Sequence, residues 1–142
     1  MNLHIDVQGD PQGLSDISCA LSAVLERRGI EKAIIDDVML ITEEVLANAI
    51  DHGFVGLAPG EGRLGVSISA EDGCLRLEFR DNGIAFNPLD QAEPDLDADI
   101  LDRPIGGLGV HLIRELSQNV YYRRDGQCNV LGLTMATHQE QR

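Results

Sequence analysis

Three short segments in fixed order, Glu44-Val-Leu-Ala-Asn48, Asp81-Asn82-Gly83 and Gly106-Gly107-Leu108-Gly109, decide how this chain folds and what it binds. An acid and an amide four positions apart share one face of a helix, about 6 Å apart, where they can hold a metal ion and its ligand. A buried Asp can accept a hydrogen bond from a nucleobase amino group, and a glycine-rich helix start can receive phosphate. Together, the three segments predict an ATP site that contains no P-loop.

The composition is that of a globular protein with a strong acidic excess. The 142 residues are 43% hydrophobic and 25% charged, so we expect one domain with a sizeable core. Eleven Lys and Arg residues oppose 24 Asp and Glu residues, which gives a net charge of −13. Because such a surface repels phosphates, we expect no direct nucleic-acid partner. No apolar run approaches the roughly 20 residues of a membrane span. Nothing resembles a signal peptide, so we expect a cytoplasmic protein without a membrane partner.

The residue inventory excludes one class of nucleotide-binding protein. Lys32 is the single lysine and no G-x-x-x-x-G-K-[ST] segment is present, which excludes a Walker-type NTPase. An ATP site must therefore use backbone N–H groups, a divalent cation and one or two Arg side chains. Cys19, Cys74 and Cys128 are widely spaced among apolar residues. We expect small buried side chains there rather than a zinc site or a disulfide framework.

Hydrophobic periodicity predicts an α+β order of elements. The predicted strands cover residues 2–8, 64–68, 75–79, 119–124 and 128–136, and the predicted helices cover 11–29, about 31–51 and 108–116. Glu71-Asp72-Gly73 and Asp125-Gly126 are hairpin turn signals, so the connections are hairpins rather than crossovers. This order predicts a two-layer α/β sandwich with a mixed, mostly antiparallel sheet and the helices packed on one face.

Residues 83–105 differ from the rest of the chain. They contain three Pro, five Asp and one Glu with only scattered apolar side chains. A loop of this length inside a compact domain is usually functional or mobile.

Glu44 and Asn48 flank the apolar stripe of the second predicted helix. A solvated helix face is the plain interpretation of an E-x-x-x-N spacing. A functional interpretation gains from the poor helix propensity of Asn, because Asn48 falls inside the helix. Its amide oxygen suits Mg²⁺, and a carboxylate one turn earlier can orient water or accept a hydroxyl proton during phosphoryl transfer.

The two glycine-containing segments are weak signals when taken singly. Asp81-Asn82-Gly83 is also a common turn sequence, and Arg103 is also an ordinary surface residue. As a ligand site, Asp81 would recognise the adenine amine, and Gly83 would let the backbone approach the ring. The glycines of 106–109 would let phosphate oxygens approach the N–H groups of a helix start, with Arg103 as a charge partner.

In combination, these segments resemble the GHKL ATPase superfamily, whose Bergerat fold is shared by gyrase-type ATPases, Hsp90 and sensor histidine kinases. Within that superfamily, the chain is most similar to the anti-sigma-factor serine/threonine kinases. The resemblance rests on residues 42–49 with His52-Gly53 (the N-box), 81–88 (the first glycine box), 106–113 (the second glycine box) and 121–133, which contain Asn129 (the closing hairpin). It covers nearly the whole chain.

The resemblance implies a role for each matching residue. Glu44 would be the general base or water-orienting acid, Asn48 the Mg²⁺ ligand and Asp81 the adenine acceptor. The other nucleotide-binding candidates are Gly83, Arg103, Gly106, Gly107, Leu108 and Gly109. Residues 84–105 would form the ATP lid of a single kinase domain spanning residues 1–142.

The resemblance also implies an activity and partners. Such kinases use ATP to phosphorylate Ser or Thr on a small antagonist protein of the STAS type. Usually as homodimers, they can also bind and inhibit a sigma factor, and phosphorylation of the antagonist makes them switch partners. We therefore expect a serine/threonine kinase that uses ATP and Mg²⁺, phosphorylates a STAS-type antagonist and acts as an anti-sigma factor. The predicted strand at residues 2–8 is the candidate dimer interface, because unpaired edges invite pairing.

Two other functions stay open at the level of sequence. Six acidic residues between positions 90 and 102 disfavour tight lid closure over a triphosphate, so we expect modest ATP affinity. This acidity favours a non-catalytic, nucleotide-dependent module that sequesters a regulator, whereas the intact Glu44 favours a kinase. A third option is a module that works with a separate histidine phosphotransfer protein.

Overall fold

The structure, a computed structural model, describes residues 1–90 and 107–138, and for residues 107–110 it describes the backbone alone. The elements are β1 (Asn2–Gln8), α1 (Pro11–Arg27), α2 (Lys32–Asn48), the π-helical turn η1 (Ala49–Gly53), β2 (Arg63–Glu71), β3 (Cys74–Asp81), the 3-10 turn η2 (Pro88–Asp90), α3 (Gly107–Leu116), β4 (Asn119–Asp125) and β5 (Cys128–Ala136).

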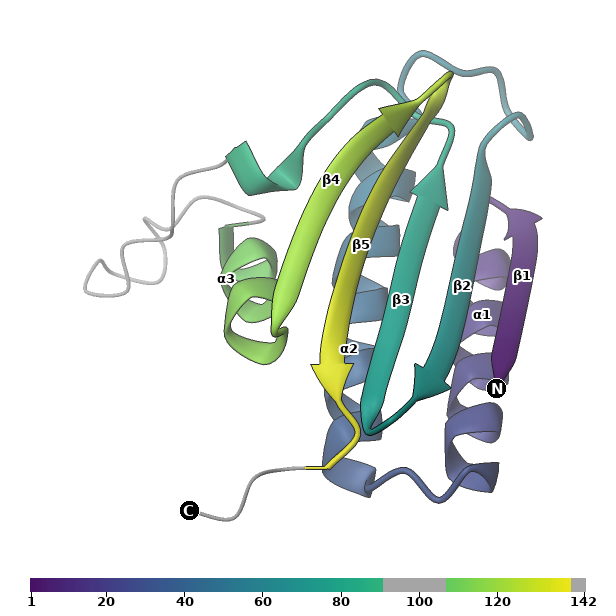
Figure 1. Cartoon of the computed structure of the whole chain (residues 1–142). Coiled ribbons are helices and arrows are strands. Elements are labelled where there is room, and N and C mark those ends of the chain that lie inside the picture. Colours follow the sequence, from purple (N-terminus) through teal and green to yellow (C-terminus); the bar gives the residue numbers. More distant parts are fainter. Residues whose placement is uncertain (91–106, 139–142) are drawn as a thin grey trace.

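The five strands form one sheet in the order β1-β2-β3-β5-β4, and each pairing of neighbours is antiparallel. Helices α1 and α2 lie behind this sheet in Figure 1, and α3 packs against α2 and the edge strand β4. The predicted two-layer α+β sandwich with helices on one face is therefore confirmed.

The core lies between the sheet and its helices. On β1 the side chains alternate, so that Leu3, Ile5 and Val7 are half-buried and their neighbours are exposed. The buried side chains that face the sheet are Ile17, Leu21 and Leu25 on α1 and Ile34, Ile35, Val38, Ile41 and Leu46 on α2. Each buried aliphatic side chain contributes about 1.5–3 kcal/mol. This apolar contact holds α2 rigidly behind the strands that carry the candidate site.

Local signals set the beginning of α1. The carboxylate of Asp10 accepts a hydrogen bond from the N–H of Gly13 at 2.7 Å, and Pro11 occupies the first helical position. Gly29 follows the helix with a φ of +71°, a left-handed conformation that glycine adopts without strain. The first predicted helix is therefore present, with Pro11 at its start and Gly29 just beyond its end.

Two details differ from expectation. The second helix was expected to reach residue 51, but α2 ends at Asn48 and the chain continues as the π-helical turn η1. A wider turn keeps the apolar spacing nearly helical, so hydrophobic periodicity does not reveal it. Cys19 is exposed, and Cys74 and Cys128 are half-buried, so the expectation that all three cysteines are buried is wrong.

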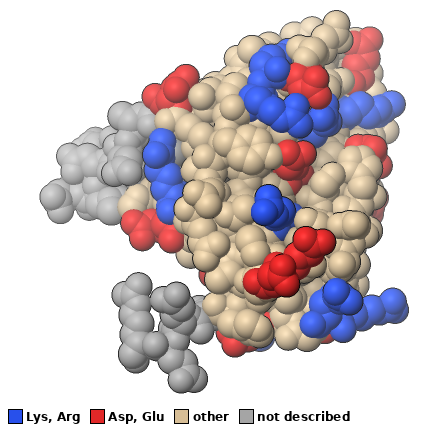
Figure 2. Space-filling view, in the orientation of Figure 1, with Lys and Arg blue, Asp and Glu red and all other residues tan. Residues whose placement is uncertain are grey.

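The opposite face of the sheet is not covered by any helix that the structure describes (Figure 1). Acidic and basic side chains lie side by side across it (Figure 2). Arg123 lies 3.8 Å from Glu78 and 3.5 Å from Asp125, and Arg80 lies 3.0 Å from Asp125. The hydrogen bond from Arg80 lowers the pKa of Asp125 and raises that of Arg80 itself.

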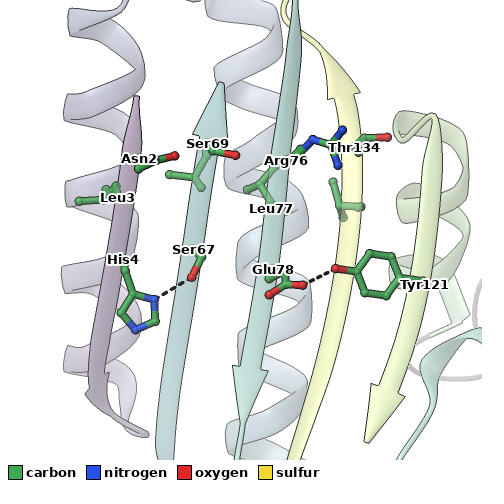
Figure 3. Close-up of a pocket in the computed structure, with 12 residues that line it drawn as sticks. Asn2, Leu3, His4, Ser67, Ser69, Arg76, Leu77, Glu78, Tyr121 and Thr134 are labelled. Carbon is green, nitrogen blue, oxygen red and sulfur yellow. Dashed lines mark hydrogen bonds between the residues drawn. The ribbon is translucent and has the colours of Figure 1, made fainter. Parts of the chain in front are cut away.

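A groove of about 560 Å³ runs across this uncovered face, and we call it the open-face groove. Its lining includes Asn2, His4, Ser67, Arg76, Glu78 and Tyr121 (Figure 3). His4 Nδ1 lies 2.7 Å from Ser67 Oγ, and Tyr121 donates a hydrogen bond to Glu78, which raises the tyrosine pKa. Of the predicted ATP-site residues, Glu44, Asn48, Asp81 and Gly83 are described with their side chains, and none of these lines this groove.

Candidate nucleotide-binding site

Helix α2 supplies Glu44 and Asn48. Both side chains are half-buried, whereas the adjacent Glu43 is exposed. Neither Glu44 nor Asn48 has a hydrogen-bond partner among the residues that the structure describes. Both side chains are partly exposed and lie one helical turn apart, so they are available to a ligand.

The turn η1 joins the end of α2 to the segment after β3. Asn48 immediately precedes η1, and the carbonyl of Gly53, its last residue, accepts a hydrogen bond from Ile84 N at 2.9 Å. A Cβ built on Gly53 would meet Gly83 at 3.8 Å and Asp81 at 3.9 Å. π-helical turns are frequent at functional sites. Here the turn brings the predicted N-box next to the predicted first glycine box.

Asp81 is the last residue of β3, and its two carboxylate oxygens differ. Oδ1 accepts hydrogen bonds from Gly83 N at 2.9 Å and from Asn129 Nδ2 at 3.0 Å. Oδ2 has no partner within residues 1–90 and 107–138, so it is free to accept from a ligand donor. The side chain therefore has the chemistry that recognition of an adenine amine requires.

Close approach explains why residue 83 is glycine. A Cβ at Gly83 would lie 2.7 Å from the carbonyl oxygen of Gly53 and 3.0 Å from Asp81 Oδ1. The first of these neighbours is backbone and cannot swing aside. Gly83 thus permits the contact between η1 and the turn after β3.

Asn82 has a structural role in the same turn. Its amide oxygen accepts from Arg63 N at 2.7 Å, and its amide nitrogen donates to Glu61 O at 2.9 Å. These bonds tie the turn to the start of β2. Asn82 thus has both amide atoms occupied, whereas the neighbouring Asp81 keeps one carboxylate oxygen free to accept a hydrogen bond.

The first part of the predicted lid is held by hydrogen bonds. Asn129 donates to Ile84 O at 2.7 Å and accepts from Phe86 N at 3.1 Å. Asn87 accepts from Leu89 N at 2.9 Å, and Arg114 of α3 donates to Leu89 O at 2.8 Å. Residues 84–90 therefore leave the sheet along a fixed path, and the remainder of the predicted lid, 91–105, lies outside the described residues.

Helix α3 begins within the second predicted glycine box. Gly107, Leu108 and Gly109 form its first turn, which is where backbone N–H groups lack partners inside the helix. Because α3 packs against α2, it belongs to the same layer as the helix that carries Glu44 and Asn48. The candidates Arg103 and Gly106 lie outside the described residues.

Two residues that touch this site were missed at the level of sequence. Arg124 donates to Gly83 O at 2.9 Å, and Tyr122 donates to Asn129 at 2.6 Å. A polar Asn129 inside the apolar run 128–135 was the available signal, since such a residue in a central strand needs partners. Its partners depend on strand register, which pairs Asn129 with Asp81 on one side and Arg124 on the other.

The fold and the site define a class of nucleotide-binding domain without a P-loop, and comparisons with known proteins agree. The histidine kinase-like ATPase domain matches residues 7–135. The chain therefore belongs to the histidine kinase-like ATPase family, which confirms the GHKL resemblance and an ATP-binding domain.

Individual relatives refine this family assignment. The serine-protein kinase RsbW of Bacillus pumilus is 25% identical over 122 residues, which cover 83% of this chain and 75% of the relative. The anti-sigma F factor of Bacillus thuringiensis is 29% identical over 84 residues, which cover 59% of this chain and 56% of the relative. The chain thus spans a little over half of that second relative.

A solved structure supports the fold. The RsbU and RsbW domains of a Mycobacterium tuberculosis protein superpose with a TM-score of 0.67 at 18% identity, covering 96% of this chain and 32% of theirs. Separately, no helix in the described part of the chain is long and apolar enough to cross a membrane.

Proposed function

We propose that this chain is an ATP-dependent serine/threonine-protein kinase of a partner-switching system, with a STAS-type antagonist as its protein substrate. The observation that carries the proposal is the hydrogen bond from Ile84 N to Gly53 O, which joins the end of α2 to the Asp81 turn. Similarity to the RsbW serine-protein kinase supports the same activity.

Asn48 is the proposed Mg²⁺ ligand. Amide oxygens are hard ligands of the kind that Mg²⁺ prefers. The Asn48 side chain is half-buried and has no hydrogen-bond partner among the described residues. Among the described residues, no group of three or more His, Cys, Asp or Glu side chains could hold a metal ion. Most ligands of the cation would therefore come from nucleotide phosphates and water, and the cation would neutralise phosphate charge during transfer.

Glu44 is the proposed general base. In the reaction, the hydroxyl oxygen of the substrate Ser or Thr forms a bond to the γ-phosphorus of ATP. The bond from that phosphorus to the β–γ bridging oxygen breaks, and ADP leaves with the electron pair. Glu44 takes the hydroxyl proton, and its unpaired, half-buried carboxylate leaves it free to do so.

The remaining candidates have binding roles. Asp81 would accept from the adenine amine through Oδ2. Gly83, Gly106, Gly107, Leu108 and Gly109 would contact the nucleotide through the backbone, and Arg103 would add positive charge. Residues 84–105 would close over the nucleotide within a single domain covering residues 1–142.

The proposed partners follow from the relatives. The name of the anti-sigma F factor supports a sigma factor as the target that this chain sequesters. Phosphorylation of the antagonist would release the kinase and return it to that target. We propose a homodimer as the working assembly and the cytoplasm as its location.

Acid-stable phosphate transfer tests this function. The wild type, Glu44→Gln and the control Glu43→Gln are incubated with γ-³²P-labelled ATP and STAS-domain proteins from the same genome. We expect label on Ser or Thr of one such protein with the wild type and the control, and at least a roughly hundredfold slower rate with Glu44→Gln. Full activity of Glu44→Gln would remove the proposed base.

A non-catalytic module that sequesters a regulator is the second candidate. The acidic lid sequence favours it, because Asp90 and its neighbours oppose closure over a triphosphate. Nucleotide-dependent binding of a partner without any label on it would support this module over the kinase. Acid-labile label would instead indicate a histidine phosphotransfer partner.

A further inference from the structure

Asn129 lies at the centre of a buried polar network behind the Asp81 turn. Its side chain is 7% exposed. Its amide nitrogen donates to Asp81 Oδ1 at 3.0 Å and to Ile84 O at 2.7 Å. Both neighbours are acceptors, so rotating the amide by 180° would place oxygen against oxygen. The orientation of the Asn129 amide is therefore determined by its surroundings.

The amide oxygen of Asn129 faces three donors. It accepts from Tyr122 Oη at 2.6 Å, from Phe86 N at 3.1 Å and from Arg124 Nη1 at 3.1 Å. The same Arg124 nitrogen donates to Gly83 O at 2.9 Å. Arg124 thus links the hairpin of β4 and β5 to the turn that follows Asp81.

This network leaves Asp81 with one oxygen to offer. Oδ1 is occupied by Gly83 N and Asn129 Nδ2, and Oδ2 is the free acceptor. Without Asn129, Gly83 N alone would hold the carboxylate, and the carboxylate plane could rotate about its terminal torsion. A rotating carboxylate would present no fixed acceptor to a base.

We propose that Asn129, held in place by Arg124 and Tyr122, is a positioning residue that sets selectivity for the 6-amino group of adenine. This inference rests on the ATP site of the proposed function. Asn129 fixes the plane of the Asp81 carboxylate, and with it the direction in which the free oxygen accepts. Its bonds to Ile84 and Phe86 fix the backbone beside the base at the same time. It acts through Asp81 and through this backbone rather than by touching the phosphates.

Other side chains at position 129 would not reproduce this arrangement. Leucine has similar volume, but it would leave Asp81 Oδ1 and Ile84 O without a donor. Aspartate would place a second carboxylate against Asp81 and oppose its ionisation. Serine is smaller than asparagine and too short to span from Asp81 to Ile84. Asn129→Ser therefore removes the two hydrogen bonds of the amide nitrogen without adding bulk.

The test compares two triphosphates that differ by one group. Mg·ATP and the Mg complex of purine riboside 5′-triphosphate, which lacks the 6-amino group, are titrated calorimetrically into the full chain. We expect the wild type to prefer ATP roughly tenfold, the effect of one well-placed hydrogen bond. In Asn129→Ser and Arg124→Gln, this ratio should fall toward one, because affinity for ATP falls by more than affinity for the purine triphosphate.

The controls separate this inference from a structural effect and from the proposed function. Gln127→Ala, an exposed change in the same hairpin, should keep the wild-type ratio. Tyr122→Phe removes only the hydrogen bond from Tyr122 to Asn129, so it serves as the test if Asn129→Ser does not fold. We expect it to lower the preference for ATP over the purine triphosphate, but less than Asn129→Ser does. Equal losses for both triphosphates, or an unchanged ratio in the folded variants, would overturn the inference alone. A wild type that binds neither triphosphate would overturn the proposed function and this inference with it.

Discussion

At the scale of single residues, the polar side chains of the candidate site divide into two groups. Asn82 and Asn129 use both atoms of their amides in hydrogen bonds within the fold. Glu44 and Asn48 are half-buried and unpaired in the part of the chain that is described. Because both side chains are partly exposed, they remain available to a ligand. The unpaired group coincides with the residues proposed to bind Mg²⁺ and to accept a proton.

The glycine at position 83 gives a prediction at this scale. Gly83→Ala should destabilise the fold by about 1–3 kcal/mol, because the new methyl would lie 2.7 Å from the carbonyl oxygen of Gly53. Urea unfolding of the variant beside the wild type measures this loss. Gly56→Ala is the matched control, since a Cβ there meets nothing within 4 Å. Equal stability of the two variants would show that η1 and the Asp81 turn are not in close contact.

At the scale of elements, the sequence predicts most of the fold because each element carries its own periodic signal. The strand at residues 2–8 and the hairpin of β2 and β3 were predicted from alternation and a turn sequence, and both are found. The end of α2 was missed by three residues, because a π-helical turn leaves no mark in apolar spacing. Packing and the bond from Ile84 to Gly53 determine that end instead.

The candidate site could be predicted only where its residues act through local motifs. Glu44, Asn48, Asp81 and Gly83 stand in short segments whose chemistry is visible in the sequence. The network of Asn129 depends on β5 pairing with β3, which brings together two residues separated by 48 positions. Such a contact comes from sheet register, and the sequence of either strand alone does not specify it.

Asp37 on helix α2 gives a prediction about how stability depends on pH. Burial, together with the nearby Asp36, raises the pKa of Asp37 above its ordinary value. Ionised Asp37 therefore lowers stability at neutral pH, and this penalty fades as the pH falls through its raised pKa and the carboxyl becomes neutral. Asp37→Asn should raise the melting temperature at pH 7 by about 1–2 °C, and the gain should vanish near pH 3.

A matched control exists for this change. Asp16 is the sixth residue of the 17-residue helix α1, as Asp37 is of the 17-residue helix α2, and Asp16 is exposed. Asp16→Asn removes the same charge from an acidic protein, but from an exposed position rather than a half-buried one. Thermal melts of both variants between pH 3 and pH 8 separate the two effects. A larger gain from Asp16→Asn would assign the stabilisation to net charge.

At the scale of the whole molecule, the sheet has one face packed on helices and one face that no described helix covers (Figure 1). The predicted interface strand β1 lies at one edge of this sheet, beside the open-face groove. The uncovered face carries both signs of charge (Figure 2), so a second copy related by a two-fold axis can match acidic with basic residues. We propose that β1 and the adjoining groove form the homodimer interface.

Added charge tests this interface. In a two-fold dimer, a substituted residue on the interface meets its own neighbourhood in the other copy, so His4→Lys combined with Ser69→Lys places like charges close together. We expect a dimer for the wild type by light scattering and at least a roughly tenfold weaker dimer for the double variant. Ser15→Lys, an exposed change on α1, should have no effect. A dimer that the double variant leaves intact would place the interface elsewhere, and a monomeric wild type would exclude the homodimer.

Calorimetric titration of Mg·ATP, Mg·ADP and Mg·GTP into the wild type and Asn48→Ala tests the central claim most directly. The account predicts adenine-selective binding that is lost in Asn48→Ala, while the melting temperature without nucleotide is unchanged and the control Glu43→Ala binds normally. Normal affinity in a folded Asn48→Ala variant would remove Asn48 from the site. No adenine nucleotide binding by the wild type would contradict the ATP site itself.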